Sequence, residues 1–231
     1  GITESPAGSG NYTASVSGTE AGTATLRAAL DGSMTAGLSA QLVLAPDSVT
    51  AGVTALTAES DNAVADGTAT NSVKATVKDA KGNPVPGITV SFSATNGATV
   101  ASTGVTGSDG TVTMTVTSTV AGASTVTASA GSSSQTASVT FTPGDAAGAK
   151  STLTASAGSI TADGSSTSLL TLTLKDVHGN AAPGRTVVFI SSLNDVTFSA
   201  VKDNGDGTYT ASLSGTLAGT ATVTVSVNGS V

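Results

Sequence analysis

Few residues of this 231-residue sequence could do chemistry, and one candidate is the acidic run Asp203-Asn204-Gly205-Asp206-Gly207. Clustered carboxylate and amide oxygens suit Ca²⁺, which takes hard oxygen ligands. The run nevertheless departs from a calcium loop, because its third position is Gly205 and its twelfth, Ser214, cannot supply a bidentate carboxylate. The corresponding segment earlier in the chain, residues 107–110, keeps only Asp109 as a carboxylate. The sequence therefore predicts a tight hairpin turn and no metal site.

Histidine and cysteine chemistry is nearly absent from the sequence. It holds one His, His178, and no Cys, which excludes disulfide scaffolds, thiolate zinc sites and histidine metal clusters. His178 aligns with Lys81 of an internal repeat, in a Gly-Asn turn that forms without a histidine, so we expect a solvated turn residue. The sequence also lacks a Gly-x-Ser-x-Gly elbow and a complete phosphate-binding glycine loop.

Two pairs of aspartates recur at equivalent positions of the repeat, Asp66 with Asp163 and Asp79 with Asp176. Paired carboxylates can hydrolyse glycosidic bonds where they flank a cleft. Recurrence in both copies instead favours structural turn residues, and we expect Asp66 and Asp163 to cap turn amides with their side chains. We therefore predict no catalytic, cofactor-binding or metal-binding residues and no enzymatic activity.

Two tyrosines, Tyr12 and Tyr209, could form a platform for stacking sugars. Tyr12 and Tyr209 occupy the inward parity of predicted strands, so we expect them in the core instead. Phe198 corresponds to Ala101 in the other copy, so a large group is present in one copy only. Phe198 is interpreted either as a core residue, which we favour, or as a contact point.

The composition is that of a β-protein with many turns. The sequence holds 41 Thr, 33 Ser and 28 Gly but only six aromatic residues, and Thr and Val favour pleated strands. A net charge of −7 with eight basic residues argues against a nucleic acid partner, because phosphates are neutralised by clustered Lys and Arg. No apolar run is long enough to span a bilayer. Without an initiator Met or a signal peptide, the sequence is expected to be a piece of a longer protein.

An internal repeat organises the chain. Shifted by 97 positions, residues 53–134 align with residues 150–231 without a gap, and about 30 of the 82 pairs are identical. The opening segment repeats only the second half of the unit. We therefore predict three units: residues 1–48, the C-terminal half of a repeat; residues 49–145, a complete domain; and residues 146–231, a domain that lacks its last strand.

Within each unit, apolar residues recur at every second position over short runs, the pattern of half-buried strands. Turn sequences such as Pro86-Gly87 and Asn96-Gly97 separate the runs. About seven such strands per unit predict an all-β fold of tandem immunoglobulin-like sandwiches with antiparallel strands, in an elongated array. The apolar residues of the middle unit are Val73, Ala75, Val77, Val90, Phe92, Val112, Met114, Val116, Val126, Ala128, Val139 and Phe141.

The run from Lys78 to Phe92, which begins Lys-Asp-Ala-Lys-Gly-Asn-Pro-Val-Pro-Gly, resembles the group 1 bacterial Ig-like domain of the intimin/invasin family. Ala65-Asp66-Gly67, Asp109-Gly110-Thr111 and the Ala121-Gly122 turn extend the resemblance, which covers nearly the whole chain. The last copy departs at positions 181 and 182, where two alanines replace Pro-Val, and we interpret this as drift within the repeat.

In that family such domains form the extracellular stalk of an outer-membrane adhesin, between an N-terminal β-barrel anchor and a distal tip that binds the host. The resemblance implies non-catalytic spacer modules at the bacterial cell surface. It implies as partner a host-cell receptor or another copy of the adhesin, contacted largely outside residues 1–231. Two alternatives stay open: a module that itself binds a receptor or a glycan, and an accessory Ig-like domain of a phage structural protein or of a secreted polysaccharide-degrading enzyme.

Overall fold

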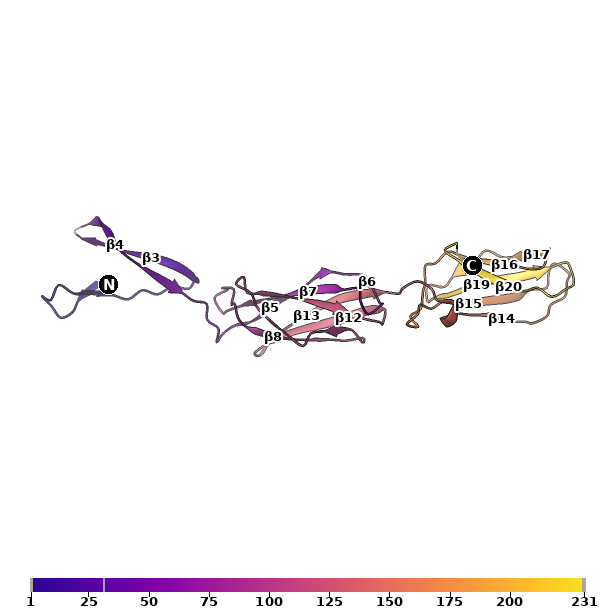
Figure 1. Cartoon of the computed structure of the whole chain (residues 1–231), viewed down its shortest axis with the longest axis horizontal. Helices are drawn as coiled ribbons and strands as arrows, with labels where there is room; N and C mark the ends of the chain where they lie inside the picture. The colour runs from indigo at the N-terminus through magenta and orange to yellow at the C-terminus, as the bar shows by residue number, and fades with distance from the viewer. Residues whose placement is uncertain (1, 31, 230–231) are drawn as a thin grey trace.

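Three β-rich units follow one another along the long axis of the molecule (Figure 1). The computed structural model describes residues 2–30 and 32–229. Within these residues the regular structure is strand apart from one short 3-10 helix, η1 (Gly148–Lys150). No helix in this part of the chain has the length and hydropathy needed to cross a bilayer.

The middle unit is a sandwich of two sheets, with strand orders β10-β8-β12-β13-β6 and β5-β7-β11-β9. Strand β6 runs parallel to β13, which differs from the purely antiparallel pairing predicted from the sequence. The reason is that the chain leaves β5 and continues onto the edge of the opposite sheet, beside β13. The strands are β5 (Gly52–Ser60), β6 (Ala63–Val64), β7 (Asn71–Lys78), β8 (Thr89–Ala94), β9 (Thr99–Val100), β10 (Thr103–Val105), β11 (Thr111–Thr117), β12 (Gly122–Ala130) and β13 (Ser133–Thr142).

The core of the middle unit follows from the alternation in the sequence, because successive side chains of a strand point to opposite faces. On β7, Val73, Ala75 and Val77 are fully buried, whereas the residues between them are half-buried. Phe92 of β8 and Phe141 of β13 enter the same core from the other sheet. The predicted inward face of these strands is confirmed.

The last unit has one complete sheet, of order β14-β15-β19-β17 with β18 also paired to β19, and a second sheet of two strands, β16 and β20. Within the described residues β20 pairs only with β16, whereas its counterpart β12 lies between β8 and β13. A strand corresponding to β13 is not among the described residues. The strands are β14 (Thr152–Ala155), β15 (Ser168–Thr173), β16 (Val187–Ser191), β17 (Val196–Phe198), β18 (Lys202–Asp203), β19 (Thr208–Gly215) and β20 (Val223–Val227).

Large side chains fill the core of the last unit. Leu172 of β15, Phe189 of β16 and Tyr209 of β19 are buried together. Half-buried Phe198 packs against them, with its ring stacked on that of Phe189 at a centroid distance of 6.0 Å. The predicted core positions of Tyr209 and Phe198 are confirmed.

The first unit consists of two hairpins, β1 (Ile2–Glu4) with β2 (Tyr12–Ala14) and β3 (Gly22–Leu30) with β4 (Ser33–Leu44). Tyr12 is 67% exposed, so the prediction that it is a core residue is wrong. The same Tyr-Thr-Ala-Ser sequence is buried at Tyr209 because a second sheet covers β19. Within the described residues β2 pairs only with β1, and no second sheet covers Tyr12.

The predicted fold class is confirmed: the chain is all-β, with Ig-like sandwiches in an elongated array (Figure 1). Two separate hydrophobic cores occupy residues 51–141 and residues 146–227. The unit boundaries at 48/49 and 145/146 stay predictions.

Candidate functional site at the interdomain junctions

A short turn after β7 is built around one carboxylate. The backbone closes it, because the N–H of Asp79 donates to the carbonyl of Asn83 and the N–H of Gly82 donates to the carbonyl of Asp79, each at 3.0 Å. Gly82 has a φ of +88°, which residues with a Cβ rarely adopt. Asp79 Oδ1 accepts the backbone N–H groups of Lys81 and Asn83, both at 2.9 Å, so the side chain fixes the turn from inside.

The same turn reaches back to the preceding unit. Asn83 Oδ1 accepts the N–H of Ala21 at 2.8 Å, and Asn83 Nδ2 donates to the carbonyl of Thr19 at 3.0 Å. Asp79 Oδ2 accepts Asn83 Nδ2 at 2.8 Å and the N–H of Asp47, in the linker, at 3.1 Å. The Asp79–Asn83 pair thus joins its own turn, the linker and the first unit. We call this arrangement a junction clasp.

A second junction clasp connects the middle and last units. Asp176 Oδ2 accepts Asn180 Nδ2 at 2.8 Å and the N–H of Gly144, in the second linker, at 3.0 Å. Asn180 Oδ1 accepts the N–H of Ala121 at 2.9 Å, and Asn180 Nδ2 donates to the carbonyl of Thr119 at 3.0 Å. Both junctions therefore use the same atoms in the same roles, over distances that agree within about 0.1 Å.

Both clasp carboxylates are held in the charged form. Hydrogen bonds from the Asn83 side chain, and from three backbone N–H groups, place the pKa of Asp79 well below its usual range, against an opposing effect of burial. Asp176 is 1% exposed, and burial is the largest single influence, raising its pKa. Hydrogen bonds from the Asn180 side chain and three backbone N–H groups together outweigh burial, so the pKa of Asp176 is also lowered.

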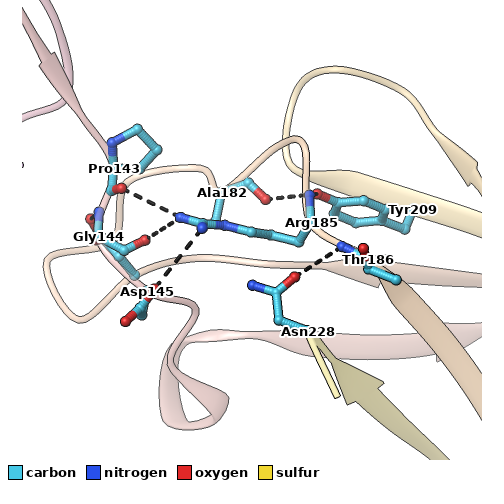
Figure 2. Close-up of polar contacts among 9 residues, drawn as sticks. Pro143, Gly144, Asp145, Ala182, Arg185, Thr186, Tyr209 and Asn228 are labelled. Carbon is cyan, nitrogen blue, oxygen red and sulfur yellow. Dashed lines mark hydrogen bonds and ion pairs between the residues drawn. The ribbon is translucent and has the colours of Figure 1, made fainter. Parts of the chain in front are cut away.

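The second junction has an additional contact, shown in Figure 2. The guanidinium of Arg185 reaches the linker, where Nη2 donates to the carbonyls of Gly144 at 2.8 Å and Pro143 at 3.4 Å. Nη1 lies 3.9 Å from Oδ1 of the exposed Asp145. The residue corresponding to Arg185 in the middle domain is Ile88, which offers no such donors, so this tie exists at the second junction alone.

The backbone around Arg185 is itself fixed by the last domain. The N–H of Arg185 donates to the hydroxyl of buried Tyr209 at 2.8 Å, and that hydroxyl donates to the carbonyl of Ala182 at 2.9 Å (Figure 2). Thr186 and Asn228 pair beside it, with the Thr186 N–H donating to Asn228 Oδ1 at 3.0 Å. The arginine therefore projects from a rigid segment onto the linker.

Sequence reasoning identified parts of this site but not its role. The Asp and Asn residues of both clasps were recognised as recurring turn residues, and their partners across the junction were missed. The detectable signal was an Asp and an Asn four positions apart in both copies. Arg185 was missed entirely, although an arginine in place of Ile88 in such a weakly charged sequence is unusual.

The other candidate residues serve turns. Asp66 Oδ1 accepts the N–H groups of Thr68 and Ala69, both at 2.7 Å, and Asp163 caps the equivalent turn of the last domain in the same way. This confirms the predicted capping. His178 is exposed in the clasp turn, where its backbone N–H donates to Asp176 Oδ1 at 2.9 Å.

The acidic run that resembles a calcium loop is also a set of turn caps. Asp203 accepts the N–H of Gly205 and the N–H of Gly184, each at 2.8 Å. Asp206 Oδ1 accepts the N–H of Thr208 at 2.9 Å. In residues 2–30 and 32–229, no group of three or more His, Cys, Asp or Glu side chains is arranged to hold a metal ion.

Comparisons with known proteins agree with this architecture. Residues 53–142 match the family model of the bacterial Ig-like domain, group 1, and residues 147–231 match the model of invasin domain 3. The structure is similar to that of InvD from Yersinia pseudotuberculosis, with 32% identity and a TM-score of 0.63 over 80% of this chain and 54% of that one. It is also similar to FdeC, an Escherichia coli adhesin, with 28% identity and a TM-score of 0.61 over 90% of this chain and 70% of that one.

A third similar structure is that of invasin, a bacterial integrin-binding protein. It shares 38% identity over 76% of this chain, with a TM-score of 0.43. The chain spans 37% of the invasin chain and about half of InvD.

Proposed function

The chain belongs to the intimin/invasin family of bacterial Ig-like domains, and from this premise we propose that its domains are non-catalytic stalk modules of a bacterial surface adhesin. In the proposed arrangement they are extracellular, anchored to the outer membrane through another part of the protein, and they project a distal tip toward a host cell or surface. The similarity to FdeC, which is an adhesin, supports this proposal.

The observation that carries the proposal is the recurrence of the junction clasp. A spacer transmits position only if adjacent domains keep a fixed angle, which short linkers alone do not enforce. In each clasp an Asn side chain makes two hydrogen bonds to the backbone of the preceding unit. The neighbouring Asp holds the linker through one backbone N–H. Because the Asp is ionised, its hydrogen bonds are of the stronger, charge-assisted kind.

The proposal is tested by removing the cross-junction bonds without touching either core. In the double variant Asn83→Ala/Asn180→Ala we expect small-angle X-ray scattering to show a lower mean radius of gyration and a broader distribution of shapes, because the domains then bend freely. The matched control is Asn204→Ala, because Asn204 lies in an exposed turn and, among the described residues, its side chain bonds only to Thr208 in the same turn.

Two results would contradict the proposal. Unchanged scattering of the double variant would show that the clasps do not set the domain angle. Saturable binding of the unmodified chain to cultured host cells would show that these domains bind a receptor themselves and are more than spacers.

A further inference from the structure

One edge of β16 in the last domain has no strand beside it in the described part of the chain. β16 pairs with β20, whereas its counterpart β8 lies between β12 and β10. The segment that corresponds to β10, residues 200–202, follows β19 instead. Lys202 pairs with Thr210 there, and the Ser199 N–H donates to the carbonyl of Ser212 at 2.9 Å. The edge is therefore open because a segment of the same domain pairs with the other sheet.

The size of the side chains at this place explains the difference. A Cβ at Gly104 of β10 would lie 2.8 Å from Cγ2 of Val112 and 2.9 Å from Sδ of Met114, so β10 needs a glycine for its close approach. The last domain has Val201 and Tyr209 in place of this glycine and this valine. Val201 is half-buried against the core. Because these two larger side chains fill the space, the segment does not take the place of β10.

The backbone groups that point to the open edge follow from the pairing of β16 with β20. In an antiparallel pair, the N–H and C=O groups of every second residue point to the same neighbour. The Ser192 N–H donates to the carbonyl of Thr222, just before β20, at 3.0 Å, so every second residue counted back from Ser192 faces β20. The residues whose backbone groups point the other way, to the open edge, are Val187, Phe189 and Ser191.

The outward face of β16 is apolar beside this edge. Val188 is 51% exposed and Ile190 is 41% exposed. Their counterparts on β8 are Ser91 and Ser93, which are also exposed although β13 is in place in that sheet. The exposure of this face therefore does not depend on a strand beyond β20. An uncharged, apolar strand with a free edge is a template for pairing with another strand.

From these observations we propose that β16 pairs antiparallel with β16 of a second copy of this chain, about a two-fold axis at Phe189. The two Phe189 residues then exchange a pair of backbone hydrogen bonds, and Val187 pairs with Ser191 of the second copy. On the outward face Val188 lies opposite Ile190 of the second copy, and cross-strand pairs of β-branched residues stabilise a sheet. The main-chain hydrogen bonds supply affinity, as in other cases of strand addition.

The charges around β16 favour a second copy of the same strand in this direction. Within residues 184–196 the charged residues are Arg185 before the strand and Asp195 after it. Antiparallel pairing brings Arg185 of each copy near Asp195 of the other, whereas parallel pairing would bring like charges together. Asp203 also lies at the Arg185 end, but its carboxylate already accepts two backbone N–H groups, and the exposed Lys202 adjoins it. No like charges oppose each other along the strand, so the net charge of −7 does not prevent the contact.

The direction of the pairing sets the direction of the two molecules. The strands of the last unit run along the long axis of the molecule (Figure 1), so two copies joined antiparallel through β16 point in opposite directions. A two-fold contact uses the same surface on both copies and closes on itself, so it stops at a dimer. This last step alone rests on the proposed stalk function: stalks joined in this way project from two facing surfaces. The two tests below measure the contact itself and do not depend on that function.

The first test is the mass of the full chain in solution. We expect light scattering after size exclusion to give masses that rise with concentration from 21.8 kDa toward twice that value. Val188→Lys/Ile190→Lys is expected to stay at the mass of one copy, because the two-fold pairing sets like charges directly opposite each other. Both replaced side chains are exposed, so this variant should fold, which circular dichroism checks. The matched control is Ser91→Lys/Ser93→Lys, at the equivalent positions of β8, whose edge β10 covers; this variant should dimerise like the wild type.

A second test fixes the register. The chain has no Cys, so Val188→Cys and Ile190→Cys can be prepared as two separate variants. Mixed in equal amounts, they should form a disulfide on mild oxidation, because positions 188 and 190 of two copies form a directly opposed pair with Cα atoms about 4.5 Å apart. Each variant by itself should give a several-fold lower yield, because equal positions of the two copies are diagonal neighbours, about 7–8 Å apart.

Four results would overturn the proposal. The first is a wild-type chain that is monomeric at every concentration, which would show that the edge is closed in solution. The second is a dimer that persists in Val188→Lys/Ile190→Lys, and the third is a dimer lost to the same extent in Ser91→Lys/Ser93→Lys, because the contact then does not lie at β16. The fourth is a disulfide yield in either single cysteine variant that equals the yield of the mixture, which would exclude the antiparallel register about Phe189.

Discussion

The chemistry of each junction clasp depends on an acceptor that has no hydrogens of its own. Two backbone N–H groups of the turn, one N–H of the linker and one side-chain amide all point at the two oxygens of Asp176. An ionised carboxylate accepts all four, whereas an Asn in this place would direct an NH₂ group at other donors. Asp is therefore required here because both of its carboxylate oxygens accept hydrogen bonds, and its negative charge strengthens each of these bonds.

We expect Asp176→Asn to lower the free energy of unfolding of the last domain by about 2 kcal/mol at neutral pH, the usual worth of hydrogen bonds to a charged group. The wild-type contribution should be fully present above the unfolded pKa of about 4, and lost as pH falls from there through the lowered folded pKa. Urea titrations at neutral pH and at stepwise lower pH measure both effects.

The control for this prediction is Asp145→Asn, which removes the same charge from a fully exposed side chain near the same junction. We expect little change in stability, because exposed ion pairs contribute little. If Asp176→Asn kept the wild-type stability at neutral pH, or the wild-type decline in acid, the four-donor account of the clasp would be wrong.

At the scale of elements, each strand forms where apolar and polar residues alternate, and burial of the apolar side chains on its inward face stabilises it. Phe92 illustrates this, because it lies on the inward face of β8 and is 6% exposed. The apolar area that it removes from water is large, and few other aromatic residues are present to compensate.

Phe92→Ala should therefore destabilise the middle domain by about 3–5 kcal/mol, the range for a buried phenylalanine that leaves a cavity. Denaturant unfolding of the full chain, followed by a probe in the middle domain, measures this. Val105→Ala is the control, because Val105 is 59% exposed on the edge strand β10. A change near zero for Phe92→Ala would place this ring outside the core.

Strands with a long alternation of apolar and polar residues can be predicted from the sequence. Strands whose formation depends on pairing with residues far away in the sequence cannot. The six- to ten-residue strands of the middle domain carry several alternating apolar positions and could be predicted. Strands β6 and β9 are two residues long, too short for a pattern, and depend on the sheet edges beside them. Tyr12 shows the complementary failure, since its local sequence is that of a core strand and only the absence of a covering sheet in the described structure leaves it exposed.

At the scale of the whole molecule, the order of the domains could be predicted from the 97-residue repeat. The contacts that hold adjacent domains at a fixed angle could not. The clasp partners in the preceding units are backbone atoms of Thr19, Ala21, Thr119 and Ala121. Every residue has a backbone carbonyl and every residue except proline has a backbone N–H, so no particular residue type marks these partners. The sequence therefore indicates the Asp and Asn side chains of each clasp, but it does not indicate the backbone groups of the preceding unit that they bind.

Among the differences between the two junctions, the replacement of Ile88 by Arg185 adds contacts to the second linker, and this predicts different stiffness. Arg185 adds donors to the second linker, whereas Ile88 at the first junction adds none. Because the chain has no Cys, spin labels can be attached to introduced cysteines at Thr23, Thr113 and Asn194, one exposed site in each unit. We expect a narrower distance distribution across the second junction than across the first.

Arg185→Ile should then widen the distribution across the second junction toward that of the first, while leaving the first unchanged. The variant should not unfold the last domain, because it removes a buried Nε that has no hydrogen-bond partner in the described structure along with the linker contacts. Arg27→Ile, at an exposed arginine of β3 far from this junction, is the control and should change neither distribution. Equal widths in the wild type, or no widening in Arg185→Ile, would show that the clasps alone set the angle and that the stalk is uniformly stiff. A widened second junction would instead make Arg185 the residue that stiffens one joint of the array above the other.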